Sequence, residues 1–163
     1  MDPMIDKIID MVIKAEGGDT VTNDPADSGG RTQYGISEKS HPEAWADGKV
    51  TLEEAQTIYF NKYVKGPGFD KVKNAKLQHQ LVDFGVNSGP GVAAKNLQQL
   101  LKVEIDGVLG PKTFEVLDKA DQKLLNNELV KLRCTLLAKI CVKNPSQLKF
   151  LVGWLNRALE FID

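Results

Sequence analysis

The feature that most constrains the fold is the spacing of apolar side chains, which is helical along most of the chain. Apolar residues recur every three or four positions, and turn-forming residues divide this pattern into segments. The pattern predicts helices at about residues 3–16, 51–63, 77–88, 91–101, 111–117, 121–142 and 146–161. Strand signals are weak and confined to residues 20–36, where we expect a small hairpin or an irregular loop. The sequence therefore predicts a mainly α fold.

Composition narrows the classes of protein to consider. The 163 residues are 42% hydrophobic and 26% charged, which fits one globular domain, with or without a small lobe. A net charge of −1 gives no reason to expect nucleic acid as a partner. No apolar run approaches the ~20 residues of a membrane span, and the N-terminus has no signal-peptide layout. His41 and His79 do not have the usual zinc spacings, so we expect no metal.

The longest predicted helix, residues 121–142, carries both cysteines. Cys134 and Cys141 are seven positions apart, or ~10 Å along a helix, which is beyond the ~7 Å that a disulfide can bridge. We expect two free thiols that pack as small hydrophobic side chains. The apolar face of this helix is predicted to consist of Leu125, Leu129, Leu132, Leu136 and Ile140.

Glu16 is the position that most resembles a catalytic site. It is the last residue of the first predicted helix, which begins at Asp2-Pro3 and is ended by Gly17-Gly18. The apolar stripe of this helix consists of Ile5, Ile8, Ile9, Val12 and Ile13. Helical spacing places Glu16 on the same stripe, so we expect burial at the negative end of the helix dipole. Both effects favour the protonated carboxyl that a general acid needs. An ordinary glutamate at a helix end is the alternative interpretation.

The loop after Glu16 contains two further carboxylates, Asp24 and Asp27, followed by the hydroxyls of Thr32 and Tyr34. Glycoside hydrolysis needs an acid that faces a second carboxylate or a held water molecule across the scissile bond. This loop could supply that partner. The alternative is that both aspartates only shape turns.

The segment from Asp47 to Glu54 imitates the second half of a calcium-binding EF-hand loop. The register fails, because Glu43 and Trp45 occupy the positions of the first ligands. A turn followed by a capping box, Thr51-x-x-Glu54, explains the segment better.

Several motifs follow one another in a fixed order. They are Glu16-Gly17-Gly18, Asn23-Asp24-Pro25, Asp27-Ser28-Gly29-Gly30, Thr32 and Tyr34-Gly35-Ile36. Together they resemble the signature of glycoside hydrolase family 108, which contains phage and bacterial lysozymes that cut peptidoglycan. Residues 81–89 resemble its central helix, residues 96–113 a peptidoglycan-binding element and residues 150–157 its C-terminal end. The chain departs from the family pattern at Asp19 and Val64.

This resemblance implies a single lysozyme-like domain over residues 1–163. Residues 1–90 would be its catalytic part, and residues 91–163 a peptidoglycan-binding-like helical part packed with it. The implied catalytic residues are Glu16, as the acid, with Asp27 and Thr32. The implied substrate-binding residues are Tyr34, Asn87 and Asp24.

We therefore expect a monomeric peptidoglycan hydrolase that cleaves the β-1,4 bond between N-acetylmuramic acid and N-acetylglucosamine, without metal or organic cofactor. A phage endolysin made in the host cytoplasm and released to the wall through a holin fits best, and an injected bacterial effector is the alternative. A lytic transglycosylase and a non-catalytic peptidoglycan-binding module are rival functions. The few histidines and cysteines disfavour a zinc amidase or a cysteine peptidase.

Overall fold

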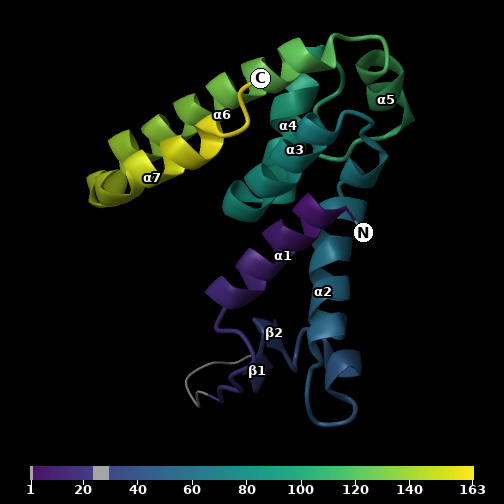
Figure 1. The fold of residues 1–163 in the computed structure, drawn as a ribbon, viewed down its shortest axis with the longest axis vertical. Helices are drawn as coiled ribbons and strands as arrows, with labels where there is room; N and C mark the ends of the chain where they lie inside the picture. Colours follow the sequence, from purple (N-terminus) through teal and green to yellow (C-terminus); the bar gives the residue numbers. More distant parts are fainter. Residues whose placement is uncertain (1, 24–29) are drawn as a thin grey trace. The chain divides into compact units, whose positions relative to one another are not determined.

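The protein consists of two compact units, divided between Lys62 and Tyr63. The computed structural model describes residues 2–23 and 30–163. These residues form seven α-helices and one two-stranded antiparallel sheet (Figure 1). The predicted mainly α fold with a small hairpin after the first helix is confirmed. The organisation as a single domain stays a prediction.

Helix α1 (Pro3–Ala15) begins as the sequence predicts. The Asp2 carboxylate accepts hydrogen bonds from the backbone N–H of Met4, at 2.8 Å, and of Ile5, at 3.4 Å. All five residues of the predicted apolar stripe are buried: Ile5, Ile8, Ile9, Val12 and Ile13. Gly17 and Gly18 end the helix with φ of 102° and 60°, a backbone conformation that favours glycine.

Helix α2 (Leu52–Phe60) packs against α1. The predicted capping box is present: Thr51 Oγ1 accepts from the Glu54 N–H at 3.2 Å, and the Glu54 carboxylate accepts from the Thr51 N–H at 2.8 Å. The Gln56 amide donates to Asp10 Oδ1 at 2.9 Å and ties the two helices together. A 3₁₀ helix (Pro42–Trp45) precedes α2, and a π-helical turn (Asn61–Lys65) follows it.

The hairpin has its turn where the sequence did not indicate one. Strand β1 (Thr32–Gln33) pairs with β2 (Ile36–Ser37) across Tyr34 and Gly35. These two residues have φ of 54° and 75°, the two positive values that a type I′ turn requires. Ahead of this hairpin, an isolated antiparallel bridge joins Thr22 to Thr32. Residues 24–29 of this segment lie outside the described residues.

The second unit contains five helices: α3 (Ala75–Ser88), α4 (Pro90–Leu101), α5 (Pro111–Leu117), α6 (Gln122–Lys143) and α7 (Leu148–Leu159). Two short 3₁₀ helices, Phe69–Lys71 and Pro145–Gln147, precede α3 and α7. Helix α3 packs against α4 and α6, and α7 folds back along α6 (Figure 1). The core of this unit includes Leu77, Leu81, Phe84, Leu97 and Leu129, each 0% exposed.

The predicted apolar face of α6 is wrong by about one residue. The residues that are buried are Asn126, Leu129, Val130, Arg133, Leu137 and Cys141. Only Leu129 belongs to the predicted set, and the other four members are half-buried. The reason is that two polar side chains turn inward. The Asn126 amide donates to the Phe161 carbonyl at 2.6 Å, and Arg133 pairs with Asp83.

Both cysteines lie on α6 and are free, as predicted. Cys141 is buried and Cys134 is half-buried. Partial burial raises the pKa of the Cys134 thiol, and the nearby Arg133 guanidinium only partly opposes this effect. Such a thiol is a poorer nucleophile at neutral pH than an ordinary cysteine, which agrees with a packing role.

A buried glutamine organises the segment that resembles a peptidoglycan-binding element. The Gln98 amide donates to Asp106 Oδ1 at 2.8 Å and to the Val108 carbonyl at 3.0 Å, and its oxygen accepts from the Gly107 N–H at 2.9 Å. The hydrogen bond from Gln98 lowers the pKa of Asp106. The turn at residues 106–108 is thereby fixed to α4.

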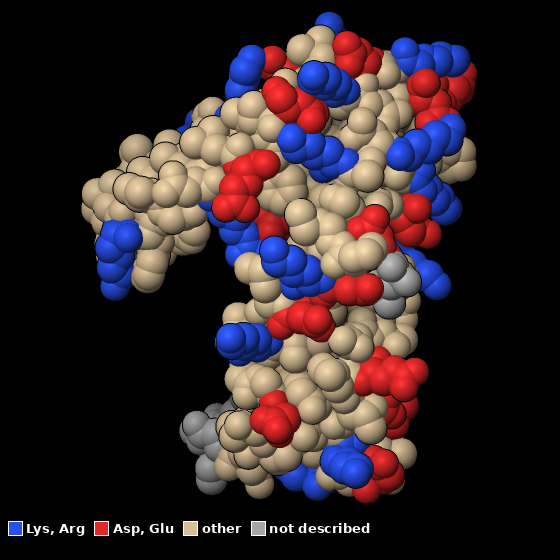
Figure 2. Space-filling view, viewed as in Figure 1, with Lys and Arg blue, Asp and Glu red and all other residues tan. Residues whose placement is uncertain are grey.

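The surface carries charges of both signs. Figure 2 shows Lys and Arg interspersed with Asp and Glu over much of one face, whereas the end of the α6–α7 pair is mainly uncharged. Exposed apolar side chains in this region include Val142, at 81%, and Val152, at 69%. Within the described part of the chain, every helix is too short or too polar to cross a membrane.

Candidate active site

Glu16 occupies the C-cap position of α1, as predicted, but its side chain is exposed. The expected burial on the apolar stripe is therefore wrong. The helix ends at Ala15, and Glu16 has φ of −82° and ψ of 11°, so helical spacing no longer determines the direction of its side chain. The carboxyl group is consequently accessible from solvent at the end of a helix.

Gly35 packs against Glu16. A Cβ atom on Gly35 would lie 2.7 Å from Glu16 Cβ and 2.4 Å from Tyr59 Oη. Distances this short do not occur between real atoms, so no side chain fits at this position without a shift of its neighbours. The end of α1, the turn of the hairpin and α2 therefore meet at Gly35.

Hydrogen bonds hold the hairpin in this place. The Tyr34 N–H donates to the Gly18 carbonyl at 2.9 Å, and the Tyr59 hydroxyl donates to the Tyr34 carbonyl at 2.9 Å. The Gln33 amide donates to the Asp19 carbonyl at 2.9 Å, and its oxygen accepts from the Val50 N–H at 2.9 Å. The double-glycine turn and the hairpin thus form one framework around Glu16.

Arg31 fixes the outer side of the hairpin. Its guanidinium donates to both carboxylate oxygens of Glu38, at 3.0 and 2.8 Å, and lies 4.7 Å from the ring centroid of Trp45. This hydrogen-bonded pair lowers the pKa of Glu38 and raises that of Arg31. Both side chains are about 40% exposed, so the pair contributes more to geometry than to stability.

The structure brings only some of the predicted site residues together. Thr32 and Tyr34 are half-buried on the same hairpin, and the turn of that hairpin contacts Glu16. Asp24 and Asp27 lie outside the described residues. Asn87 belongs to the second unit, where its amide donates to the Asp83 carbonyl at 3.0 Å. Its place in a cleft stays an expectation from the resemblance.

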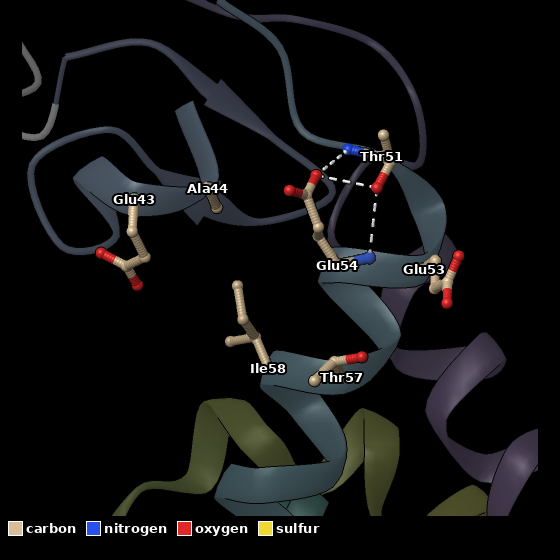
Figure 3. A pocket seen from close by; sticks show the side chains of 7 residues that line it. All are labelled: Glu43, Ala44, Thr51, Glu53, Glu54, Thr57 and Ile58. Atoms are coloured by element: carbon tan, nitrogen blue, oxygen red, sulfur yellow. Dashed lines mark hydrogen bonds between the residues drawn. The ribbon is translucent and has the colours of Figure 1, made fainter. Parts of the chain in front are cut away.

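A hollow in the first unit lies beside the start of α2. Figure 3 shows its lining, which does not include Glu16. Its volume is about 470 Å³, and three carboxylates line it: Glu43, Glu53 and Glu54. Glu54 serves the capping box, and Glu43 pairs with His41 at 3.3 Å. Two of the three carboxylates thus have structural partners, so we do not assign the catalytic acid to this hollow.

Sequence reasoning missed three residues that position the site: Arg31, Gly35 and Tyr59. Gly35 was considered only as a member of the Tyr34-Gly35-Ile36 motif, and neither Tyr59 nor Arg31 was considered as a site residue. The glycine beside Tyr34 was a usable signal, because a glycine in a short strand segment often marks a turn or a close approach.

Replacing Gly35 by Ala is expected to lower activity on peptidoglycan by roughly tenfold to a hundredfold, because displacing a reacting group by about 1 Å has effects of that order. The new methyl group would push Glu16 and Tyr59 apart. Gly48→Ala is the matched control: Gly48 also has a positive φ, of 89°, but nothing lies within 4 Å of its missing Cβ. Both variants should lose some stability. Equal activities of the two folded variants would contradict the role of Gly35.

Comparison with known proteins identifies the class. Residues 9–89 match the model of the glycosyl hydrolase 108 family, and residues 92–159 match that of a predicted peptidoglycan domain. A glycosyl hydrolase segment followed by a peptidoglycan domain identifies an enzyme that acts on peptidoglycan. The exposed Glu16 at the end of α1 lies within the glycosyl hydrolase segment. The segment of residues 9–89 belongs to glycoside hydrolase family 108.

Solved structures include a similar protein. The structure of Brucella abortus SagA has 29% sequence identity to this chain and a TM-score of 0.62. The similarity covers 99% of this chain and 97% of that one. The curated proteins contain no match.

Proposed function

We propose that the protein is an N-acetylmuramidase that hydrolyses the β-1,4 bond between N-acetylmuramic acid and N-acetylglucosamine. The observation that supports this most is the placement of Glu16. It is exposed at the end of α1, it is packed against the hairpin through Gly35, and it lies inside the segment that matches the hydrolase family. An exposed carboxyl can reach the glycosidic oxygen of a polymer that binds along the surface.

In this mechanism Glu16 donates its proton to the glycosidic oxygen while an oxocarbenium-like transition state develops. Asp27 stabilises the positive charge or, with Thr32, holds the attacking water. Tyr34, Asn87 and Asp24 form hydrogen bonds with the acetamido sugars. The reaction needs only these protein groups and water, without a metal or organic cofactor.

We place the enzyme in a phage lysis system. It would be made in the cytoplasm of the host bacterium, as a monomer, and would reach the cell wall through a holin. Delivery as an injected bacterial effector is the second candidate route.

Product analysis tests the proposed reaction. Mass spectrometry of peptidoglycan digested by the protein should find N-acetylmuramic acid with a reducing end. Anhydro-muramic ends would instead identify a lytic transglycosylase, which also needs one acidic glutamate. Cleaved peptides with intact glycan strands, or no product at all, would overturn the assignment to a glycosidase of this bond.

The second catalytic group can be found by comparing three variants. We expect Asp27→Asn and Thr32→Ala to lower turnover more than they lower the melting temperature. Asp24→Asn, which precedes Pro25, should do less. Rates and melting temperatures of all three decide the ranking. It is wrong if Asp24→Asn has the largest effect on turnover in a folded protein.

A further inference from the structure

The second unit contains a buried cluster of charged side chains in which positive charges outnumber negative charges. The Asp83 carboxylate, on α3, is 3% exposed and accepts hydrogen bonds from two guanidinium groups. Arg133 Nη2 donates to Oδ2 at 2.5 Å, and Arg157 Nε and Nη2 donate to Oδ1 at 2.8 and 2.6 Å. One negative charge thus faces two positive charges, and one positive charge is left without a counterion in the cluster.

One nitrogen of this cluster lacks a hydrogen-bond partner. Arg133 is 2% exposed, and among the residues that the structure describes none accepts a hydrogen bond from its Nη1 atom. The rings of Phe84 and Phe161 lie 5.4 and 5.8 Å from the guanidinium carbon, which stabilises the cation but does not replace an acceptor. A buried charged donor without an acceptor is costly and calls for an explanation.

A small cavity lies beside the two arginines of this cluster. It has a volume of about 90 Å³, and Arg133 and Arg157 both line it. Asn87 and Ser88 add polar groups, while Leu137, Ile140 and Trp154 form an apolar wall. No carboxylate is among these lining residues. Asn87 is exposed, and Ser88 and Arg157 are half-buried, so the rim of the cavity reaches solvent.

We propose that this cavity binds the terminal carboxylate of a short peptide. A carboxylate carries the single negative charge that the cluster lacks, and it accepts from guanidinium N–H groups in a planar arrangement. A phosphate, with a charge of about −1.5 to −2, would exceed that balance. The apolar wall fits a small side chain such as a methyl group.

The size of the cavity limits the ligand. The volume corresponds to about three water molecules at ~30 Å³ each, which suits a terminal alanine but not a sugar ring with an acetamido group. Given the proposed function, the ligand is the C-terminal alanine of a peptidoglycan stem peptide. The cavity would then hold the peptide while the hydrolase site acts on the glycan.

An NMR titration tests the site directly. The probe is N-acetyl-D-alanyl-D-alanine, and its C-terminal amide is the matched control ligand. Trp154 lines the cavity, whereas Trp45, the other tryptophan, belongs to the first unit and serves as an internal reference. We expect the acid to shift the indole signal of Trp154 and leave that of Trp45 in place. The amide should shift neither signal.

Two variants on α6 complete the test. Ile140→Phe fills the cavity and should weaken binding of the acid at least tenfold. Val142→Phe changes a side chain that is 81% exposed and does not line the cavity, so it should bind as the wild type does. No shift with the acid, an equal shift with the amide or with acetate at the same concentration, or unchanged binding by folded Ile140→Phe would overturn the proposal.

The same variant separates this inference from the proposed function. Ile140→Phe should cleave peptide-free glycan chains at the wild-type rate, because that substrate has no peptide carboxylate. If the wild type cleaves the glycan but does not bind the acid, only the carboxylate site is wrong. If the wild type binds the acid but releases no reducing muramic ends, the carboxylate site is supported and the muramidase assignment is wrong.

Discussion

The variant Glu16→Gln is expected to keep the fold and to lose about 10²–10⁴-fold of its activity on peptidoglycan, the usual contribution of a general acid. An amide has nearly the same shape as a carboxyl group but cannot donate the required proton. The side chain is exposed, so the exchange should cost little stability. The measurement is the initial rate of reducing-end release from purified cell walls, with circular dichroism to verify the fold.

Glu53→Gln is the matched control for this experiment. Glu53 is also exposed, and it lines the hollow beside α2 without belonging to the capping box (Figure 3). Its exchange should leave the rate within about twofold, as expected for a group outside the chemistry. A folded Glu16→Gln protein that keeps more than about a tenth of the wild-type rate would exclude Glu16 as the acid. A large loss in Glu53→Gln would point to the hollow instead.

The variant Asp83→Asn is expected to lower the free energy of unfolding of the second unit by about 3–5 kcal/mol, because it leaves two guanidinium groups without their buried counterion. Urea unfolding can be followed by NMR of the two tryptophan indoles. The signal of Trp154, on α7, should disappear at lower urea concentration, whereas that of Trp45 reports the first unit separately.

Asp118→Asn provides the comparison. Asp118 pairs with Lys73 at 2.6 Å, but its side chain is 40% exposed. Exposed ion pairs contribute about 0–1 kcal/mol, so this variant should unfold almost as the wild type does. Similar midpoints for the two variants would mean that the Asp83 cluster contributes no more than a surface pair.

The helices could be predicted from the sequence because their signals are local. The apolar stripe of α1, its Asp2 cap and the capping box of α2 each depend on residues within a few positions of one another. The direction of Glu16 could not be predicted in this way. It lies one residue beyond the helix, where the period of 3.6 residues no longer applies.

Long-range partners explain the other differences. Arg133 lies on the buried face of α6 because Asp83, fifty positions away, neutralises it, and no local pattern reveals that pair. The hairpin turn places Tyr34 at a positive φ, which is uncommon for a residue other than glycine, asparagine or aspartate. Within the candidate site, Glu16 could be chosen from its local motif, whereas the contact between Gly35 and Tyr59 joins distant segments.

The Asp83 cluster also limits where the chain can be divided into fragments that fold. The hydrolase family match ends at residue 89 and the next match begins at residue 92. These limits suggest a domain boundary between α3 and α4. Helix α3 is nevertheless a central core element of the second unit, and its Asp83 depends on Arg133 and Arg157 from the following segment. A fragment cut at residue 90 would expose Leu81 and Phe84 to water. Exchange of wall-binding modules in this protein therefore has to carry α3 along with α6 and α7.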